Sequence, residues 1–234
     1  MQKLRSGLFL FGLGVWTVLY GVIIPPLSPL LPKKLRYWFS NLWVRVMTRW
    51  LCISVGVKIE IEGLDNIPKS GPFVVVPNHQ STPETFLMQK LFYPAVPALK
   101  RELLRVPFFG WAAQVGYPIA IDRAKPKQAL EQVRTKGLSR LSDGINVIIY
   151  PEGTRNDYPT IGKYARGAAA LAEQGNVPIL PVVHNSGYIW PQKRFEKRSG
   201  VFKVVIGEPI YPNQDLTATQ MIQKAAEWAK SVEV

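Results

Sequence analysis

The sequence predicts an α/β fold in which helices flank a mostly parallel central sheet, with a further helical segment at the N-terminus. Two observations carry this prediction. From residue 55 onward, short β-branched runs alternate with helical patterns, whereas the first 52 residues hold two long apolar patterns and no strand-like run. A chain of 234 residues has the length for one such domain and a short appendage.

Residues 8–24 form an apolar run without charged side chains. Lys3 and Arg5 precede it, and a proline-rich stretch, residues 25–32, follows it. A signal peptide would have a shorter apolar region and a cleavage site of small residues, so we expect the run to be retained. Its length is close to the minimum for a helix that crosses a bilayer.

Residues 35–51 have the pattern of an amphipathic helix. Apolar residues recur every three or four positions and arginines form a cationic side, which is typical of a helix at a membrane interface. We therefore predict that residues 1–52 are membrane-anchoring helices, either two helices in one leaflet or one span with an interfacial helix. Residues 53–234 then form the second domain. A buried helix of a soluble core is the alternative interpretation.

The expected strands are short apolar runs rich in β-branched residues: 57–61, 73–76, 119–121, 147–150, 179–183 and 202–206. Two of them, 73–76 and 147–150, are apolar throughout, which predicts central strands. The run 57–61 alternates with charged residues and suits a sheet edge. Residues 128–141 show the clearest helical pattern, and strands that alternate with helices in this way predict parallel pairing.

Lysine and arginine outnumber aspartate and glutamate by 29 to 16, which gives a formal net charge of +13. Such a charge attracts anionic membranes, phosphorylated substrates or nucleic acid. The basic residues are scattered among apolar segments, which favours a lipid surface over nucleic acid. With two histidines and one cysteine at no metal-ligand spacing, neither a metal site nor an intrachain disulfide is expected.

His79 lies in the polar segment 78–84, immediately after the expected central strand 73–76. Open α/β sheets bind ligands at the carboxyl ends of their strands, so a site is expected here. An imidazole can accept a proton from an alcohol near neutral pH, and the Glu84 carboxylate can fix its tautomer. Glu84 can equally form a helix-capping box with Ser81, and the pattern leaves both interpretations open.

A second polar segment, residues 150–155, follows the other central strand and should reach the same edge of the sheet. Gly153 permits a tight turn, and Arg155 can bind an anion through two parallel hydrogen bonds. Arg123 is expected at the end of a further strand, predicted at residues 119–121. Cations that converge on one histidine predict an alcohol substrate that carries a phosphate. Surface ion pairs with neighbouring carboxylates are the alternative for both arginines.

Four sequence blocks occur in order: residues 78–84, 100–123, 151–155 and 177–183. Together they resemble the glycerolipid acyltransferase superfamily, most closely its bacterial 1-acyl-sn-glycerol-3-phosphate acyltransferases, over a stretch from about Gly63 to Pro209. One residue departs from the commonest family pattern. Glu84 stands where that pattern has aspartate, so the carboxylate is one methylene further from the backbone.

The resemblance implies acyl transfer from acyl-CoA or acyl-ACP to the 2-hydroxyl of 1-acyl-sn-glycerol-3-phosphate, forming phosphatidic acid. It implies no covalent acyl-enzyme, no metal and no cofactor besides this co-substrate. Because positive residues favour the inside, we expect the protein at the cytoplasmic face of the cell inner membrane. Its expected partners are a lysophospholipid, acyl-CoA or acyl carrier protein, and an anionic membrane, without nucleic acid. Another lysolipid acceptor, or lipid binding without catalysis, are the alternatives.

In the implied mechanism His79 is the catalytic base and Glu84 orients its ring. Backbone donors near His79 are expected to stabilise the oxyanion, and His184 is expected to have a structural role. The expected substrate-binding residues are Lys100, Arg123, Glu152, Gly153, Thr154 and Arg155.

Overall fold

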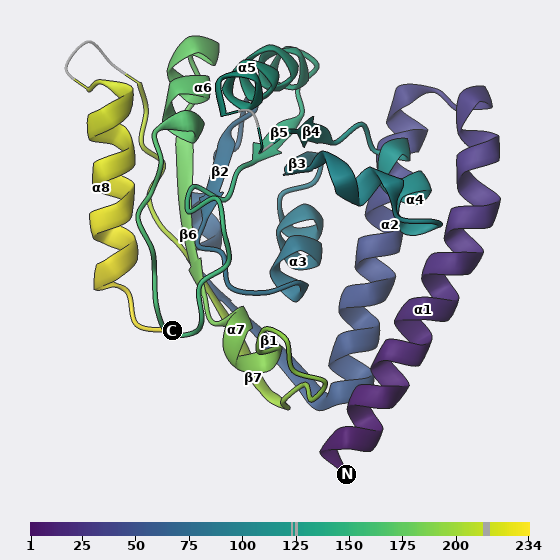
Figure 1. Ribbon diagram of the computed structural model, residues 1–234. Coiled ribbons are helices and arrows are strands. Elements are labelled where there is room, and N and C mark those ends of the chain that lie inside the picture. Colours follow the sequence, from purple (N-terminus) through teal and green to yellow (C-terminus); the bar gives the residue numbers. More distant parts are fainter. Residues whose placement is uncertain (123, 125, 213–215) are drawn as a thin grey trace.

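A layered α/β arrangement is formed by residues 1–122, 124, 126–212 and 216–234, which the computed structural model describes (Figure 1). The strands are β1 (Val57–Glu62), β2 (Val74–Pro77), β3 (Ala95–Lys100), β4 (Ile119–Ile121), β5 (Asn146–Ile148), β6 (Ile179–His184) and β7 (Gly200–Ile206). In this part of the chain they form one seven-stranded sheet with the order β1-β7-β6-β2-β5-β3-β4. The five strands from β6 to β4 are mutually parallel, while β7 is antiparallel to β6 and parallel to β1. The predicted mostly parallel sheet is confirmed.

Helices cover both faces of this sheet. The α-helices are α1 (Gln2–Leu27), α2 (Lys33–Leu51), α3 (Pro83–Leu91), α4 (Phe109–Val115), α5 (Pro126–Ser142), α6 (Gly167–Gly175), α7 (Ser186–Ile189) and α8 (Ala218–Ser231). The short 3-10 helices are η1 (Ser28–Leu30), η3 (Leu64–Asn66) and η4 (Arg101–Arg105), and η2 (Cys52–Gly56) is a π-helix.

Alternate residues of the central strands face opposite sides of the sheet, as the pleat requires. Val74 and Val76 belong to the core that includes residues of α5, α6 and α8. Val75, between them, belongs to the core that includes residues of α1 and α3. Figure 1 shows the same division, with α5, α6 and α8 on one side and α1, α2 and α3 on the other. The site-bearing strands are therefore buried on both faces.

The predicted positions of three strands are confirmed, and one strand was missed. β1 lies at the sheet edge, while β2 and β5 are central. The strand β3 was not predicted, because Pro97 interrupts its apolar pattern and Pro94 directly precedes it. The prediction of a strand through residue 150 is wrong at its end, since β5 stops at Ile148. The helix predicted at 128–141 is confirmed, slightly extended, as α5.

The two N-terminal helices pack on α3 and α4, and α1 exposes apolar side chains along much of its length. Phe9 is fully buried, and its ring meets that of Trp190 edge to face at 5.3 Å. The segment Gln2–Leu30 is long and apolar enough to cross a bilayer, and only 17% of its most apolar window is buried. This exposure argues against a buried helix of a soluble core. Division of the chain into two domains at residue 52 stays a prediction.

Asn146 joins three segments at the amino end of β5. Its Oδ1 accepts a hydrogen bond from the amide of Phe73 at 3.0 Å, and its Nδ2 donates to the carbonyl of Phe92 at 2.8 Å. The side chain is almost fully buried, so water cannot replace these partners. Its position opposite the carboxyl ends of the strands makes Asn146 a structural residue.

Replacing Asn146 by alanine should leave two buried backbone groups without a partner. We expect the free energy of unfolding of Asn146→Ala to be lower by about 2–4 kcal/mol. Urea unfolding of the detergent-purified protein measures this change. Gln174→Ala, at an exposed position of α6, is the control and should change stability by less than about 0.5 kcal/mol. Equal losses in both variants would contradict the assigned role.

Candidate active site

The carboxyl ends of β2, β5 and β6 meet at one edge of the sheet because these neighbouring strands are parallel. The buried side chain of Asn78, directly after β2, connects two of them. Its Nδ2 donates to the carbonyl of His184 at 3.0 Å, and its Oδ1 accepts from the amide of His184 at 2.9 Å. The loop that carries His79 is thereby fixed to the end of β6.

His79 and Glu84 are in direct contact at this edge. Nδ1 of His79 lies 2.5 Å from Oε1 of Glu84, which is in the first turn of α3 and fully buried. The imidazole is also mostly buried, with 10% of its side chain exposed. An ionised carboxylate accepts the Nδ1 hydrogen and leaves the lone pair on Nε2, which is the tautomer a base needs.

Glu84 also binds the backbone of the preceding loop. Its carboxylate accepts hydrogen bonds from the amides of Gln80, at 3.1 Å, and Ser81, at 2.6 Å. The reciprocal capping box with Ser81 as N-cap is wrong, because Thr82 is the N-cap and the Ser81 hydroxyl donates to the carbonyl of Trp190. Glu84 therefore combines the two roles that the sequence left open, contact with the histidine and satisfaction of backbone donors.

The second oxygen of Glu84 faces the end of β6. The Ser186 hydroxyl donates to it, and Nε2 of the fully buried His184 lies 3.7 Å away. Burial lowers the pKa of His184, so this imidazole is neutral at neutral pH. Burial raises the pKa of Glu84, but His184 and the hydrogen bonds from His79 and Ser186 outweigh it, so the pKa lies below the ordinary 4.5.

Tyr150 packs on the face of the His79 ring. Its ring stacks on the imidazole of His79 with centroids 4.2 Å apart and an angle of 28° between planes. Burial raises the pKa of Tyr150 well above its ordinary value, while nearby Arg155 lowers it, so the phenol stays protonated. Arg155 itself lies five residues after Tyr150, in the turn that follows β5.

Glu152 holds the backbone of the histidine loop. Its carboxylate accepts from the amides of His79 and Gly162, each at 2.7 Å, and from the side-chain amide of Asn156. Burial raises the pKa of Glu152, partly offset by these hydrogen bonds. The Glu152 carboxylate thus connects the histidine loop to the loop 152–162.

These contacts overturn one expectation about the oxyanion. The backbone amides of His79, Gln80 and Ser81 all donate to carboxylates, of Glu152 for the first and of Glu84 for the other two. They are therefore not available to a developing oxyanion. The expectation that backbone donors near His79 serve this purpose is wrong for these three amides.

The remaining predicted residues fall into three places. Gly153 has a φ of +68°, and Thr154 and Arg155 are exposed beside it, in the turn after β5. Within the described residues Arg155 forms no ion pair, so the predicted alternative of a pair with Glu152 is not found. Lys100 ends β3, two strands from β2, with its Nζ 3.8 Å from Glu102. Arg123 lies outside the described residues.

Three contributors to the site were not assigned a role from the sequence: Asn78, Tyr150 and Ser186. Asn78 and Ser186 lie within two residues of the histidines, at strand ends, and Tyr150 is the polar member of an apolar run.

Among the residues that the structure describes, no group of three or more histidine, cysteine, aspartate or glutamate side chains could hold a metal.

Comparison with known proteins gives the same region a family. The sequence profile of the acyltransferase family matches residues 58–185, which include His79, Glu84 and the turn after β5. A 1-acyl-sn-glycerol-3-phosphate acyltransferase of Pseudomonas aeruginosa is 39% identical over 97% of this chain and 90% of its own length.

More distant similarities agree. The human 1-acyl-sn-glycerol-3-phosphate acyltransferase alpha is 34% identical over 74% of this chain and 62% of its own length. The Saccharomyces cerevisiae 1-acyl-sn-glycerol-3-phosphate acyltransferase is 32% identical over 70% of this chain, which spans 54% of that protein. The crystal structure of the Thermotoga maritima 1-acyl-sn-glycerophosphate acyltransferase PlsC supports the fold, with a TM-score of 0.81, 24% identity and coverage of 98% and 93% of the two chains. The chain therefore belongs to the acyltransferase family.

Proposed function

We propose that this chain transfers an acyl group from acyl-CoA or acyl-ACP to the 2-hydroxyl of 1-acyl-sn-glycerol-3-phosphate, forming phosphatidic acid. The observation that carries the proposal is the buried contact of 2.5 Å between His79 and Glu84, which engages Nδ1 and leaves Nε2 as the ring nitrogen that can accept a proton. The relatives that share most of the chain are named for this reaction.

In the proposed mechanism His79 is the base. Nε2 takes the proton of the 2-hydroxyl while the oxygen attacks the thioester carbonyl, and the carbon–sulfur bond then breaks. The imidazolium returns the proton to the thiolate that leaves, so the products are an ester and a free thiol. Glu84 orients the ring and stabilises its charged form. Every proton is accounted for by His79, so we propose that no metal or further cofactor takes part.

The proposed acceptor site lies around the turn after β5. Arg155 is exposed, makes no ion pair within the described residues and lies in the turn that follows Tyr150, whose ring stacks on His79. A guanidinium in this position can hold the acceptor phosphate and keep the 2-hydroxyl near Nε2. Gly153 and Thr154 shape this turn, while Glu152 positions the His79 backbone. Lys100 and Arg123 complete the proposed anion-binding set.

We further propose that the chain works at the cytoplasmic face of the cell inner membrane. Its apolar N-terminal segment, Gln2–Leu30, supports an anchor, and exposed side chains of α1 are available to lipid. The formal net charge of +13 attracts the chain to anionic lipid, where a lysophospholipid acceptor resides. The soluble partner is then acyl-CoA or acyl carrier protein.

Replacing His79 by alanine should remove the base. We expect His79→Ala to lower kcat about a thousandfold and also to lower the urea-unfolding midpoint, because the buried Glu84 carboxylate loses a hydrogen-bond donor. The measurement is phosphatidic acid formed from labelled acyl-CoA or acyl-ACP and lysophosphatidate by detergent-purified protein. Gln174→Ala is the control and should match wild type. If wild type acylates only another lysolipid, or nothing, the proposed function is wrong.

Replacing Glu84 by glutamine should change the pH dependence of stability. The pKa of Glu84 in the folded state lies below the ordinary 4.5, so the unfolded chain binds more protons in acid. Its contribution is fully present above about pH 4.5 and is lost as the pH falls through the folded pKa. We expect Glu84→Gln to be less stable than wild type by about 3 kcal/mol at neutral pH, with a difference that shrinks in acid.

Urea-unfolding midpoints of both proteins between neutral pH and about pH 3 measure this effect. Glu227→Gln, at an exposed position of α8, is the matched control and should follow the wild-type curve. A gap between Glu84→Gln and wild type that stays constant over the whole pH range would show that the Glu84 charge does not stabilise the fold.

Charged residues on the exposed side of α1 should weaken membrane association. Val18 and Val22 are 41% and 54% exposed, and a lysine at the centre of a spanning helix costs about 2.5–3.5 kcal/mol. We expect wild type to stay with membranes during an alkaline carbonate wash and the Val18→Lys/Val22→Lys variant to be released. Leu130→Lys, on α5, is the control and should behave as wild type. Complete release of wild type would exclude an integral anchor.

A further inference from the structure

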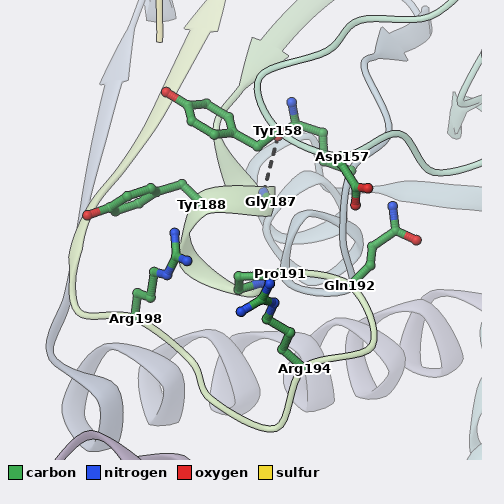
Figure 2. A pocket seen from close by; sticks show the side chains of 9 residues that line it. Asp157, Tyr158, Gly187, Tyr188, Pro191, Gln192, Arg194 and Arg198 are labelled. Carbon is green, nitrogen blue, oxygen red and sulfur yellow. Dashed lines mark hydrogen bonds between the residues drawn. The ribbon is translucent and has the colours of Figure 1, made fainter.

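A cavity of about 320 Å³ lies beside the histidine loop, and neither His79 nor Glu84 lines it. Gln80, which follows His79 directly, lines it together with Gly187 of α7. The Gln80 side-chain oxygen accepts from the Gly187 amide at 3.1 Å, a bond drawn in Figure 2. The cavity therefore opens next to the segment that carries the proposed base.

Two arginines give the cavity a positive wall. Figure 2 shows the guanidinium groups of Arg194 and Arg198 rising from the loop 191–199 toward Gly187. Within the described residues, neither guanidinium forms an ion pair; that of Arg198 lies 5.3 Å from the centre of the Tyr188 ring. Asp157 is the acidic residue of the lining, so the arginines are in excess. Two unpaired guanidiniums at one cavity are suited to a phosphate.

The loop that carries these arginines has a fixed shape. Lys197, only 2% exposed, donates through Nζ to the carbonyls of Arg194 at 3.0 Å and Phe195 at 2.7 Å. The ammonium also lies 4.6 Å from the centre of the Trp190 ring, and burial lowers the pKa of Lys197. A buried lysine that binds backbone carbonyls holds the loop before any ligand arrives, which reduces the ordering cost of binding.

We propose that this cavity binds the phosphate end of the pantetheine arm of the acyl donor, through Arg194 and Arg198. The inference rests on the proposed function, in which Arg155 holds the acceptor phosphate near Tyr150; Arg155 does not line the cavity. The reaction joins two substrates at His79, and the second of them carries its thioester on a flexible arm that ends in a phosphate. Acyl-CoA and acyl carrier protein share this phosphate.

The first test separates the two substrates kinetically. Arg194→Gln and Arg198→Gln should each raise the KM for acyl-CoA about tenfold, because a charge-assisted hydrogen bond to phosphate is lost, and leave the KM for lysophosphatidate unchanged. Lys193→Gln, an exposed residue of the same loop outside the cavity lining, is the matched control and should keep both KM values. Arg198→Lys retains the charge and should recover part of the loss.

A second donor checks that the phosphate is what the arginines recognise. Acyl-pantetheine has the thioester and the arm but no phosphate, so wild type and both glutamine variants should use it with equal kcat/KM. Acyl-ACP, whose arm keeps one phosphate, should show a raised KM with the variants, as acyl-CoA does. A loss of kcat/KM with acyl-pantetheine would mean that the arginines act on folding or on catalysis, and would overturn the proposal.

Direct binding keeps this inference apart from the proposed reaction. Calorimetric titration of CoA into detergent-purified wild type requires no acceptor and no turnover, and its Kd should rise about tenfold in either glutamine variant. This result is measurable even if lysophosphatidate is not the acceptor. A raised KM for lysophosphatidate with an unchanged donor KM would assign the cavity to the acceptor and overturn the proposal. Unchanged donor KM and CoA binding in both variants would overturn it as well.

Discussion

The constraint on which the site depends is the burial of the Glu84 carboxylate. A charge without access to water is tolerated only if hydrogen bonds and opposite charge replace its hydration. Glu84 obtains these donors from the loop after β2, through the amides of Gln80 and Ser81 and the ring of His79. A further donor, the Ser186 hydroxyl, comes from the helix after β6. One carboxylate thus joins two strand ends, and the histidine is held by the same network that neutralises the charge.

A second carboxylate completes the support of the histidine loop. Glu152, from the turn after β5, accepts the amide of His79, and the carbonyl of His79 accepts the amide of Asn156 at 2.8 Å. Both the amide and the carbonyl of His79 are therefore hydrogen-bonded. The preceding residue, Asn78, is bound to His184. A base held in this way loses little freedom when substrate binds, which is the physical content of preorganisation. The same bonds occupy the nearby amides, so charge on the reacting carbonyl must be stabilised by other groups.

Much of the sheet could be predicted from the sequence, because burial on both faces leaves uninterrupted apolar runs. The runs that became β2 and β5 are of this kind, and their carboxyl ends mark the site that contains His79 and Glu84. The strand β3 was not predicted because a proline interrupts its apolar run. Its place in the sheet depends on its partners β4 and β5. Local pattern cannot report pairing between residues that are distant in the chain.

The role of each residue within the site could not be predicted from the sequence either, because these roles also depend on contacts between distant residues. The family resemblance implied that Glu152 binds substrate together with Gly153 and Thr154, yet its carboxylate accepts the His79 amide, 73 residues earlier. Ser186 meets Glu84 across a separation of 102 residues. Neither contact produces a periodic pattern in the sequence. Residue type and position at a strand end locate a site, but tertiary contacts decide which side chains face the substrate and which hold the loop.

The helix proposed to lie in the membrane contacts the segments that shape the site. The Phe9 ring packs on Trp190, and the Ser6 hydroxyl accepts the Lys197 amide at 2.8 Å. The carbonyl of Trp190 in turn accepts the Ser81 hydroxyl, two residues from His79. The first turns of α1 are thus bound to the loop 191–199, which carries Arg194 and Arg198. Through Trp190 they are also bound to the histidine loop. Because these contacts are direct, the proposed placement of α1 in a lipid surface would also orient the loop that carries His79.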